Sequence, residues 1–324
     1  MKLFLKMSDI ENVEALIQEA LAIKKHPYKD KELGAGLKFG MLFLNASLRT
    51  RLSTEMAAKN LGLEVQVLNM ASEAWALEFE EGAIMNGDKP EHIKEAAGVI
   101  GAYFDLLALR NFPSLTNQVA DEDEHVMKAF ARYSKKPLLS MESAIRHPLQ
   151  GLADMLTINE YREKKKPKVV LTWAPHIKAL PQAVPNSFVE WSLAAGHDLH
   201  IAHPPGLELH PEITDGAIIH HTQEEALRDA DFIYVKNWSK REPYGQTYQG
   251  GEEWMLNEAR LIEAPNAKIM HCLPVRRNVE LSDDLLDSPR SLVLKQAENR
   301  LWAAQAVLKR MIESLKQEAA HVGN

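Results

Sequence analysis

The 324-residue sequence has a single cysteine, Cys272, which excludes an internal disulfide framework and a cysteine-based zinc cluster. It has no apolar run approaching the roughly 20 residues that a membrane-spanning helix needs, and the apolar start at 1–7 is too short for the core of a signal peptide. It also has no excess of basic residues, because the net charge is −7. We therefore expect a soluble, cytoplasmic protein that binds neither nucleic acid nor a membrane.

Histidine is more abundant, with 13 residues, but its arrangement predicts no metal site. Neither the pair at 220–221 nor the segment 197–200 has the carboxylate and histidine spacing of a zinc centre. We expect no metal and no organic cofactor.

The order of apolar segments predicts the fold class. Strand-like runs alternate with helical patterns, which is typical of parallel sheets covered by helices on both faces. The first series has expected strands at 39–44, 63–68, 104–109 and 137–140, and expected helices at 51–61, 91–100 and 121–133. After a helix at 149–163 and a lysine run with proline at 164–167, the second series has expected strands at 168–173, 198–203, 217–221, 232–236 and 268–273.

Two series in one chain of this length predict two domains, since single cores rarely grow beyond ~250 to 300 residues. We expect an α/β protein with two doubly wound parallel-sheet domains joined by bridging helices. The domains span 1–148 and 149–297, and a last helix at 298–320 packs back on the first. In such sheets ligands bind beyond the carboxyl ends of strands, in a cleft that here would lie between the domains.

The segment Ser47-Leu48-Arg49-Thr50-Arg51 stands between an expected strand and an expected helix. A helix N-terminus after a strand presents free backbone N–H groups and the positive end of the helix dipole to an anion. Two hydroxyls and two arginines add donors suited to a phosphate group. The alternative is a capped helix with a solvated basic face.

Four further motifs follow in order along the chain. They are Arg110 after the apolar run 105–109, H-P-L-Q at 147–150, H-C-L-P at 271–274 and E-N-R at 298–300. Together with the first segment they resemble the aspartate/ornithine carbamoyltransferase family over nearly the whole chain. Leu48 replaces the family's usual threonine, and this departure resembles the branch that acts on N-acylated ornithines.

The resemblance implies transfer of the carbamoyl group from carbamoyl phosphate to the side-chain amine of an N-acylornithine, in arginine biosynthesis. It implies that the first domain binds carbamoyl phosphate and the second the acylornithine. The residues implied for carbamoyl phosphate are Ser47, Leu48, Arg49, Thr50, Trp75, Arg110, His147, Gln150, Cys272, Leu273 and Arg300.

Four of these residues are the expected catalytic groups: Arg49, Arg110, His147 and Cys272. Rigidly held charged donors neutralise the leaving phosphate and polarise the carbonyl. No general base is evident, so catalysis depends mainly on positioning. Outside the motif set, His147 would be interpreted as a structural histidine and Arg110 as a surface ion pair; for Cys272, orienting the substrate is favoured over a covalent role.

The resemblance implies acylornithine binding by Pro90, Glu142, His176, Lys236 and Arg276. A cation such as Lys236 or Arg276 suits the α-carboxylate, and Glu142 suits the amide N–H that only an acylated ornithine presents. Without the resemblance Lys236 would be interpreted as a surface lysine at a strand end.

Pro90 bears on the acyl group. Relatives that use acetylornithine have an acidic residue at this position, whereas those that use succinylornithine have proline. A carboxylate there would repel the carboxylate of a succinyl group, and proline would not. Gln305, where the acetylornithine branch has lysine, points the same way. We therefore expect succinylornithine, with acetylornithine as the alternative; Pro90 also fits the first residue of the helix at 91–100.

Trp75 lies in a loop, 71–76, that in this family reaches the active site of a neighbouring subunit, which implies a homotrimer. A tryptophan covering its own core is the alternative. Two other classes remain. A catalytically silent relative would be expected to lose one of the motif arginines or His147. A nicotinamide-dependent dehydrogenase would need its glycine fingerprint after a strand, whereas the cluster Gly34–Gly40 precedes one.

Overall fold

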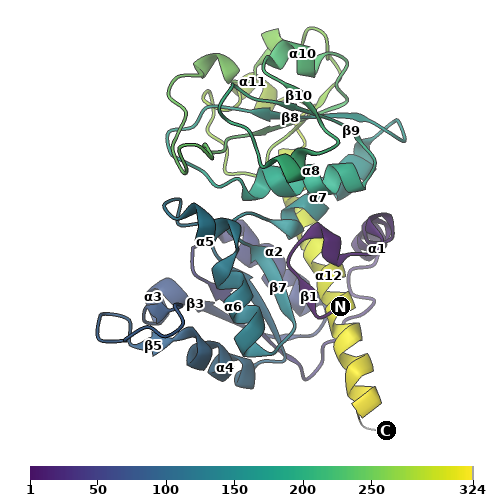
Figure 1. The fold of residues 1–324 in the computed structure, drawn as a ribbon. Coiled ribbons are helices and arrows are strands. Elements are labelled where there is room, and N and C mark those ends of the chain that lie inside the picture. The colour runs from purple at the N-terminus through teal and green to yellow at the C-terminus, as the bar shows by residue number, and fades with distance from the viewer. Residues whose placement is uncertain (323–324) are drawn as a thin grey trace. The chain divides into compact units, whose positions relative to one another are not determined.

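The computed structural model describes residues 1–322, which form two compact units (Figure 1). Unit 1 contains Met1–Pro113, Val119–Leu149 and the chain from Arg300 on, and unit 2 contains Ser114–Gln118 and Gln150–Asn299. Helices α7 (Pro148–Tyr161) and α12 (Val293–Val322) contribute residues to both units. Each unit holds a five-stranded parallel sheet, so the predicted fold class is confirmed.

The sheet of unit 1 has the strand order β1-β7-β6-β2-β3. Its strands are β1 (Leu3–Phe4), β2 (Lys38–Phe43), β3 (Glu64–Asn69), β6 (Leu106–Arg110) and β7 (Leu138–Glu142). The chain runs from β2 to β3 on one side and later returns to β6 on the other side of β2. The order therefore reverses at the carboxyl ends of β2 and β6, where open α/β sheets bind ligands.

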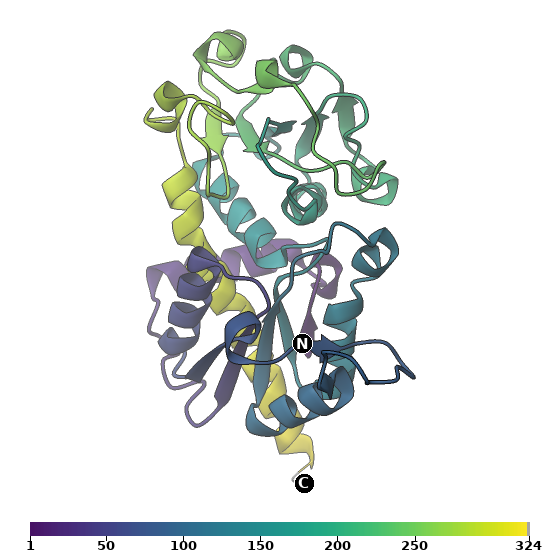
Figure 2. The same ribbon diagram turned by 90° about the vertical axis from the view of Figure 1, so that its left-hand side faces the viewer.

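Helices lie on both sides of these strands (Figure 2). On one face, α4 (Ile93–Tyr103) and α6 (His125–Ser134) bury apolar residues against β2, β6 and β7. Gly101 allows the two helices to approach closely, because a Cβ there would lie 2.3 Å from the carbonyl oxygen of Ser134. The other helical segments of this unit are η1 (Met7–Asp9), α1 (Val13–Lys25), α2 (Leu48–Asn60), α3 (Met70–Glu73) and α5 (Gln118–Glu122).

Helix α12 is tied to unit 1 by side chains near its middle. Gln305 accepts a hydrogen bond from Asn60 and donates one of 2.6 Å to the carbonyl of Pro27. Lys309 and Arg310 form ion pairs with Asp30 and Glu19. The helix begins at Val293, five residues before the predicted start.

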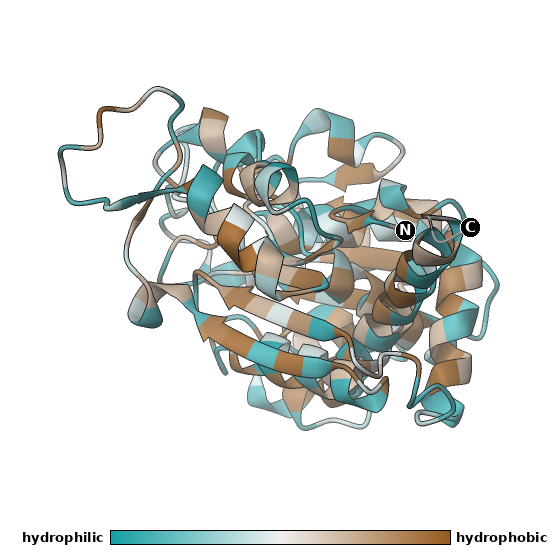
Figure 3. Cartoon of the chain, turned by 90° about the horizontal axis from the view of Figure 1, so that it is seen from below, coloured by the Kyte–Doolittle hydropathy of each residue, from teal (hydrophilic) through white to brown (hydrophobic). Residues whose placement is uncertain are grey.

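A small parallel ladder joins β4 (Leu77–Glu78) to β5 (Glu91–His92), and the segment between them projects as a mostly hydrophilic loop (Figure 3). Helix α4 begins at Ile93 with His92 as its N-cap, so the predicted start at 91 is wrong. The His92 Nδ1 accepts the N–H of Lys94, which fixes the helix start. Pro90 is therefore an exposed loop residue and not the first residue of a helix.

Unit 2 has the sheet order β10-β9-β8-β11-β12. Its strands are β8 (Lys168–Trp173), β9 (Asp198–Ala202), β10 (Ile218–His220), β11 (Phe232–Lys236) and β12 (Lys268–Met270). Its helical segments are α8 (Ala183–Ala194), α9 (Pro211–Thr214), α10 (Gln223–Leu227), η2 (Glu252–Trp254), η3 (Glu258–Leu261) and α11 (Asp283–Leu286). Here the order reverses between β8 and β11.

The predicted strands at 168–173 and 232–236 coincide with β8 and β11. The predicted helix at 121–133 is wrong as one element, because Glu124 has φ 53° in the left-handed region and separates α5 from α6. Helix α8 was not predicted: most of its residues are buried, which removes the amphipathic period that marks a surface helix. No helix among residues 1–322 is long and apolar enough to cross a membrane.

Candidate active site

The N-terminus of α2 follows the carboxyl end of β2 at the reversal of the unit 1 sheet. Ser47 is the N-cap, with extended backbone, and its hydroxyl accepts the N–H of Thr50 at 3.4 Å. The same hydroxyl donates to the Thr50 Oγ1 at 3.0 Å. Leu48 is 69% exposed. Its side chain has no hydrogen-bond donor, so its backbone N–H is the only donor that this residue can offer a ligand. The helix start and its cap are therefore as the sequence predicts, with the first backbone N–H groups of α2 at the carboxyl end of β2.

Arg110 ends β6 and reaches the same region. Its Nη1 donates to the carbonyls of Asn45 and Ala46 at 2.8 and 3.0 Å, and its Nη2 lies 3.0 Å from the Glu142 Oε2. The guanidinium also stacks over Phe112, 4.2 Å from the ring centre. Burial lowers the pKa of Arg110 and Glu142 opposes this. The side chain is therefore a buried, ion-paired group and not a surface ion pair.

Arg300 comes from α12 and meets the α2 N-terminus from the other end of the chain. Its Nη2 donates to the Thr50 Oγ1 at 2.5 Å and lies 3.4 Å from the His147 Nε2. Arg49 is half-buried and close enough to Arg110 to lower its pKa electrostatically. We call Arg49, Arg110 and Arg300 the arginine cluster. In the described chain, the Nε atoms of Arg49 and Arg110 are buried without a hydrogen-bond partner.

His147 is buried beside this cluster. Its Nε2 lies 3.7 Å from the Glu142 Oε2. Burial and the positive charges of Arg300 and Arg110 hold its pKa well below the ordinary value of 6.5. The imidazole is therefore neutral near pH 7 and can serve as a hydrogen-bonding group without adding charge.

Two positions differ from the expectations for this region. Arg51 is exposed and pairs with Glu55 at 3.8 Å on the surface of α2, outside the arginine cluster. Asn45, which no motif singled out, supports the site twice: its carbonyl accepts from Arg110, and its Oδ1 accepts the N–H of Phe112 at 2.6 Å. In the sequence, only its position two residues before the helix cap Ser47 could have indicated this supporting role.

In unit 2 the sheet order reverses between β8 and β11; His176 follows β8, and Lys236 is the last residue of β11. The Arg276 Nε donates to the His176 Nε2 at 3.1 Å. The His176 Nδ1 lies 3.0 Å from the Lys178 carbonyl oxygen and 3.1 Å from the Lys178 backbone nitrogen, so the backbone of residue 178 also holds the ring. Lys236 is 7% exposed, which excludes a surface lysine. These three residues therefore give unit 2 cationic and hydrogen-bonding groups at its switch point.

The segment after β12 carries Cys272, Leu273 and Arg276. Cys272 is buried, and Leu273 has φ 56°, a left-handed conformation that leucine rarely adopts. The Leu273 N–H donates to the His271 Nδ1 at 2.9 Å. This bond holds the unusual backbone, so the directions of the thiol and of the Leu273 carbonyl depend on His271.

Gln150 lies on α7 and is described with unit 2. Its Nε2 donates to the Asp154 Oδ1 at 2.7 Å, and Gln296 donates to the same oxygen at 2.7 Å. The Gln150 Oε1 is buried with no partner within the described residues. Its orientation is thus fixed by a network between α7 and α12.

Trp75 and Pro90 lie on the exposed segment around the β4–β5 ladder. Trp75 is 61% exposed, and its Nε1 donates to the Glu91 Oε2 at 2.6 Å. Trp75 therefore does not cover a core of its own chain. Both residues are exposed, unlike the buried Arg110 and Arg300, so this pair forms a separate part of the predicted site.

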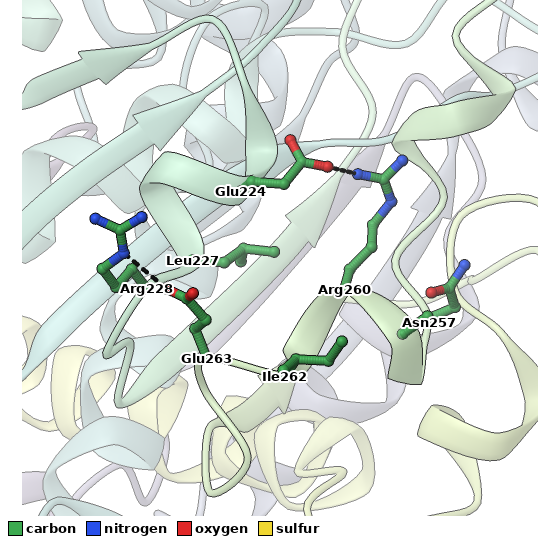
Figure 4. Close-up of a pocket in the computed structure, with 8 residues that line it drawn as sticks. Glu224, Leu227, Arg228, Asn257, Arg260, Ile262 and Glu263 are labelled. Carbon is green, nitrogen blue, oxygen red and sulfur yellow. Dashed lines mark hydrogen bonds and ion pairs between the residues drawn. The ribbon is translucent and has the colours of Figure 1, made fainter.

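Two hollows in unit 2 differ in their relation to these residues. One, of ≈ 420 Å³, is lined by His176 together with Ile177, Tyr248 and Glu252. Another, of ≈ 440 Å³, lies between α10 and η3, where Glu224 pairs with Arg260 and Arg228 with Glu263 (Figure 4). Its charges neutralise one another and no predicted site residue lines it. Within residues 1–322, no three histidine, cysteine or acidic side chains gather as a metal site.

Comparison with known protein families matches both halves of the chain. Residues 2–160 match the carbamoyl-phosphate-binding domain of aspartate/ornithine carbamoyltransferases, and residues 181–311 match the aspartate/ornithine-binding domain of the same family. The chain belongs to the aspartate/ornithine carbamoyltransferase family. This membership confirms the resemblance seen in the motifs and excludes the dehydrogenase alternative.

Individual relatives are similar over almost their full length. An N-succinylornithine carbamoyltransferase of Bacteroides thetaiotaomicron is 46% identical over 318 residues, covering 98% of this chain and 100% of the relative. An N-acetylornithine carbamoyltransferase of Xanthomonas axonopodis pv. citri is 34% identical, covering 95% and 96%. A crystal structure of an N-acetyl-L-ornithine transcarbamylase variant, with one glutamate replaced by proline, is bound to carbamyl phosphate and N-succinyl-L-norvaline. It has a TM-score of 0.90 at 32% identity, covering 96% of this chain and all of that one.

Proposed function

We propose that this protein transfers the carbamoyl group of carbamoyl phosphate to the side-chain amine of N2-succinyl-L-ornithine, giving N-succinyl-L-citrulline and phosphate in arginine biosynthesis. The observation that carries the reaction class is the arginine cluster at the N-terminus of α2, with one buried carboxylate, Glu142, among three arginines. This excess of positive charge suits a dianionic phosphate.

Within this proposal unit 1 binds carbamoyl phosphate. The backbone N–H groups of residues 48–50 and the side chains of Ser47, Arg49 and Thr50 receive the phosphate, and Arg110 and Arg300 contact its oxygens. His147 is neutral, so it hydrogen-bonds the carbamoyl end without opposing the cationic cluster. Gln150, Cys272 and the Leu273 carbonyl orient the carbamoyl group. As phosphate departs, the arginines stabilise the charge that develops on it.

Unit 2 binds the acylornithine in this scheme. Lys236 and Arg276 supply positive charge for its α-carboxylate, and His176 is held by Arg276. The attacking amine must be neutral, and the motifs of the sequence include no evident general base. Carbamoyl transfer then depends on binding the neutral amine and on positioning. Glu142 pairs with Arg110. In this scheme the Glu142 carboxylate also accepts the substrate amide N–H, through oxygen lone pairs that the ion pair does not use.

The succinyl group is favoured by two facts. The relative named for succinylornithine is more similar to this chain than the relative named for acetylornithine, at 46% against 34% identity. Pro90 is exposed and uncharged, and an acetylornithine relative with a glutamate replaced by proline was crystallised with a succinyl compound. A proline in place of a carboxylate removes charge repulsion against the succinyl carboxylate.

We propose further that the protein is a cytoplasmic homotrimer in which the segment bearing Trp75 and Pro90 completes the site of a neighbouring subunit. The support is that both residues are exposed, Trp75 just before β4 and Pro90 in the loop between β4 and β5. A homotrimer would bury this exposed tryptophan against a ligand or a partner.

The test of function is formation of the citrulline derivative from carbamoyl phosphate with ornithine, N-acetylornithine and N-succinylornithine side by side. We expect the highest kcat/KM with the succinyl compound. Preference for the acetyl compound would retain the reaction and reject the Pro90 argument. Absence of transfer to all three would leave a silent relative that only binds ligands.

A further inference from the structure

Glu280 is a carboxylate of unit 2 that no sequence motif singled out. It is 1% exposed and contacts the segment 271–276, which carries Cys272, Leu273 and Arg276. Its Oε1 lies 3.3 Å from the His271 Nε2, and its Oε2 accepts the backbone N–H of Arg276 at 2.8 Å. One side chain thus holds the segment at both ends.

The first contact determines the state of His271. The His271 Nδ1 accepts the N–H of Leu273, so the ring proton must sit on Nε2, where it is donated to Glu280. The backbone N–H of His271 is held separately by the Gln296 Oε1 at 2.9 Å. Glu280 therefore selects the tautomer that supports the left-handed backbone of Leu273, although it does not touch Leu273.

The second role of Glu280 is electrostatic. Burial raises the pKa of Glu280, but the hydrogen bond from His271, the charge of Lys236 and the Arg276 N–H outweigh burial and lower the pKa below its ordinary value of 4.5. The carboxylate is therefore ionised at any working pH. Its negative charge faces the positive charge of the buried Lys236, which is one of the groups that lower the pKa of Glu280.

We propose that Glu280 is a positioning residue of the acylornithine-binding unit, which sets the His271 tautomer, the Leu273 and Arg276 backbone and the charge balance of Lys236 without touching either substrate. The inference depends on the proposed carbamoyl transfer and adds a residue to it. Leu273, Arg276 and Lys236, which have predicted substrate contacts, then depend on one carboxylate. Metal ligands depend in the same way on the neighbouring residues that orient them.

The test is Glu280→Gln in the full-length protein. The amide keeps the size of the side chain and an acceptor for the Arg276 N–H, but it removes the charge and allows an N–H to face His271. Glu280→Asp keeps the charge and serves as the conservative variant. Glu263→Gln is the matched control, since Glu263 is an exposed, ion-paired glutamate of the same unit that pairs with Arg228.

We expect Glu280→Gln to lower kcat/KM for the acylornithine roughly 10- to 100-fold, mainly through KM, and Glu280→Asp to recover part of the loss. Binding of carbamoyl phosphate alone, followed by calorimetry, stays within about threefold of wild type in each variant, because the arginine cluster that receives the phosphate belongs to unit 1 and only the Leu273 carbonyl at the carbamoyl end depends on Glu280. Glu263→Gln stays at the wild-type value in both measurements.

The inference is overturned if Glu280→Gln stays within twofold of wild type for the acylornithine, or if it loses carbamoyl phosphate binding to the same extent as acylornithine turnover, since that would be general disruption. If Glu280→Gln does not fold, Glu280→Asp decides by the same comparison: a raised acylornithine KM with unchanged carbamoyl phosphate binding supports the inference, and wild-type KM rejects it. A wild-type protein that transfers no carbamoyl group refutes the proposed function itself, and the positioning role with it.

Discussion

Arg300 donates a 2.5 Å hydrogen bond to the hydroxyl of Thr50, 250 residues earlier in the chain. The bond ties the last helix to the N-terminus of α2, where the N-cap hydroxyl of Ser47 meets the same Thr50 oxygen. Both contacts lie within unit 1, so the start of α2 depends on residues from both ends of the chain.

Thr50→Val tests this relationship. The substitution keeps the shape but removes the oxygen, leaving a buried arginine N–H without its partner, which costs about 1–3 kcal/mol. We expect a lower denaturation midpoint and weaker carbamoyl phosphate binding. Thr54→Val is the control, because Thr54 is buried one turn later in α2 and its Oγ1 has no hydrogen-bond partner among the described residues. Equal behaviour of the two variants in denaturation and binding would contradict the prediction.

The motif at 47–51 contains a predicted binding arginine, Arg49, and a surface arginine, Arg51. Arg49 is half-buried next to Arg110, whereas Arg51 is exposed and paired with Glu55. We expect Arg49→Gln to lower kcat/KM for carbamoyl phosphate roughly 10²-fold, the usual loss for a donor that stabilises developing charge. Arg51→Gln should change it less than about threefold, because exposed ion pairs contribute little. Steady-state kinetics at saturating acylornithine measure both, and a larger loss in Arg51→Gln would reverse the assignment.

His147 predicts a pH dependence of stability. Its pKa in the folded protein lies well below 6.5, so the unfolded chain binds the proton more readily. Its contribution is fully present above about pH 6.5 and is lost as the pH falls toward the folded pKa, by up to about 1.4 kcal/mol per pH unit. We expect the stability of wild type to fall more steeply between pH 6.5 and 5 than that of His147→Gln. Urea denaturation across that range measures the difference, and parallel curves would show that the imidazole is not held neutral by folding.

Pro90→Glu tests the acyl preference. A carboxylate at this position repels the succinyl carboxylate and leaves an acetyl group unaffected, so the ratio of kcat/KM for succinyl over acetyl should fall by about tenfold or more. Asn86→Glu adds the same charge to an exposed position of the same loop and should leave the ratio unchanged. An unaltered ratio in Pro90→Glu would show that this position does not select the acyl group.

Shared sites predict complementation between subunits. Trp75→Ala and Arg49→Gln should each have low activity alone, because each removes one part of every site. If Trp75 acts on a neighbouring subunit, unfolding and refolding the two variants together restores activity, since some sites in mixed oligomers combine an intact Trp75 with an intact Arg49. Recovery requires an oligomer, which light scattering measures. Mixed samples no more active than the sum of their parts would place all site residues in one chain.

The sequence by itself determined the family and the alternation of strands and helices. Apolar periodicity and ordered motifs are local signals, and they located β8 and β11 to the residue. The N-cap at Ser47 was likewise readable, because capping needs only neighbouring residues. Local signals failed where packing overrides them: α8, buried over most of its surface, shows no helical period, and Glu124 breaks a helix that the pattern continues.

Only the tertiary structure decided how residues distant in sequence act on one another. Three contacts join residues that no spacing rule connects: the Asn45 carbonyl with Arg110, Glu142 with Arg110, and Glu280 with His271. Arg49 and Arg51 belong to one motif, but only the tertiary structure shows that Arg49 joins the arginine cluster and that Arg51 lies on the surface of α2. Burial removes water as the competing partner, so the role of each charge depends on which groups the fold brings within hydrogen-bonding distance.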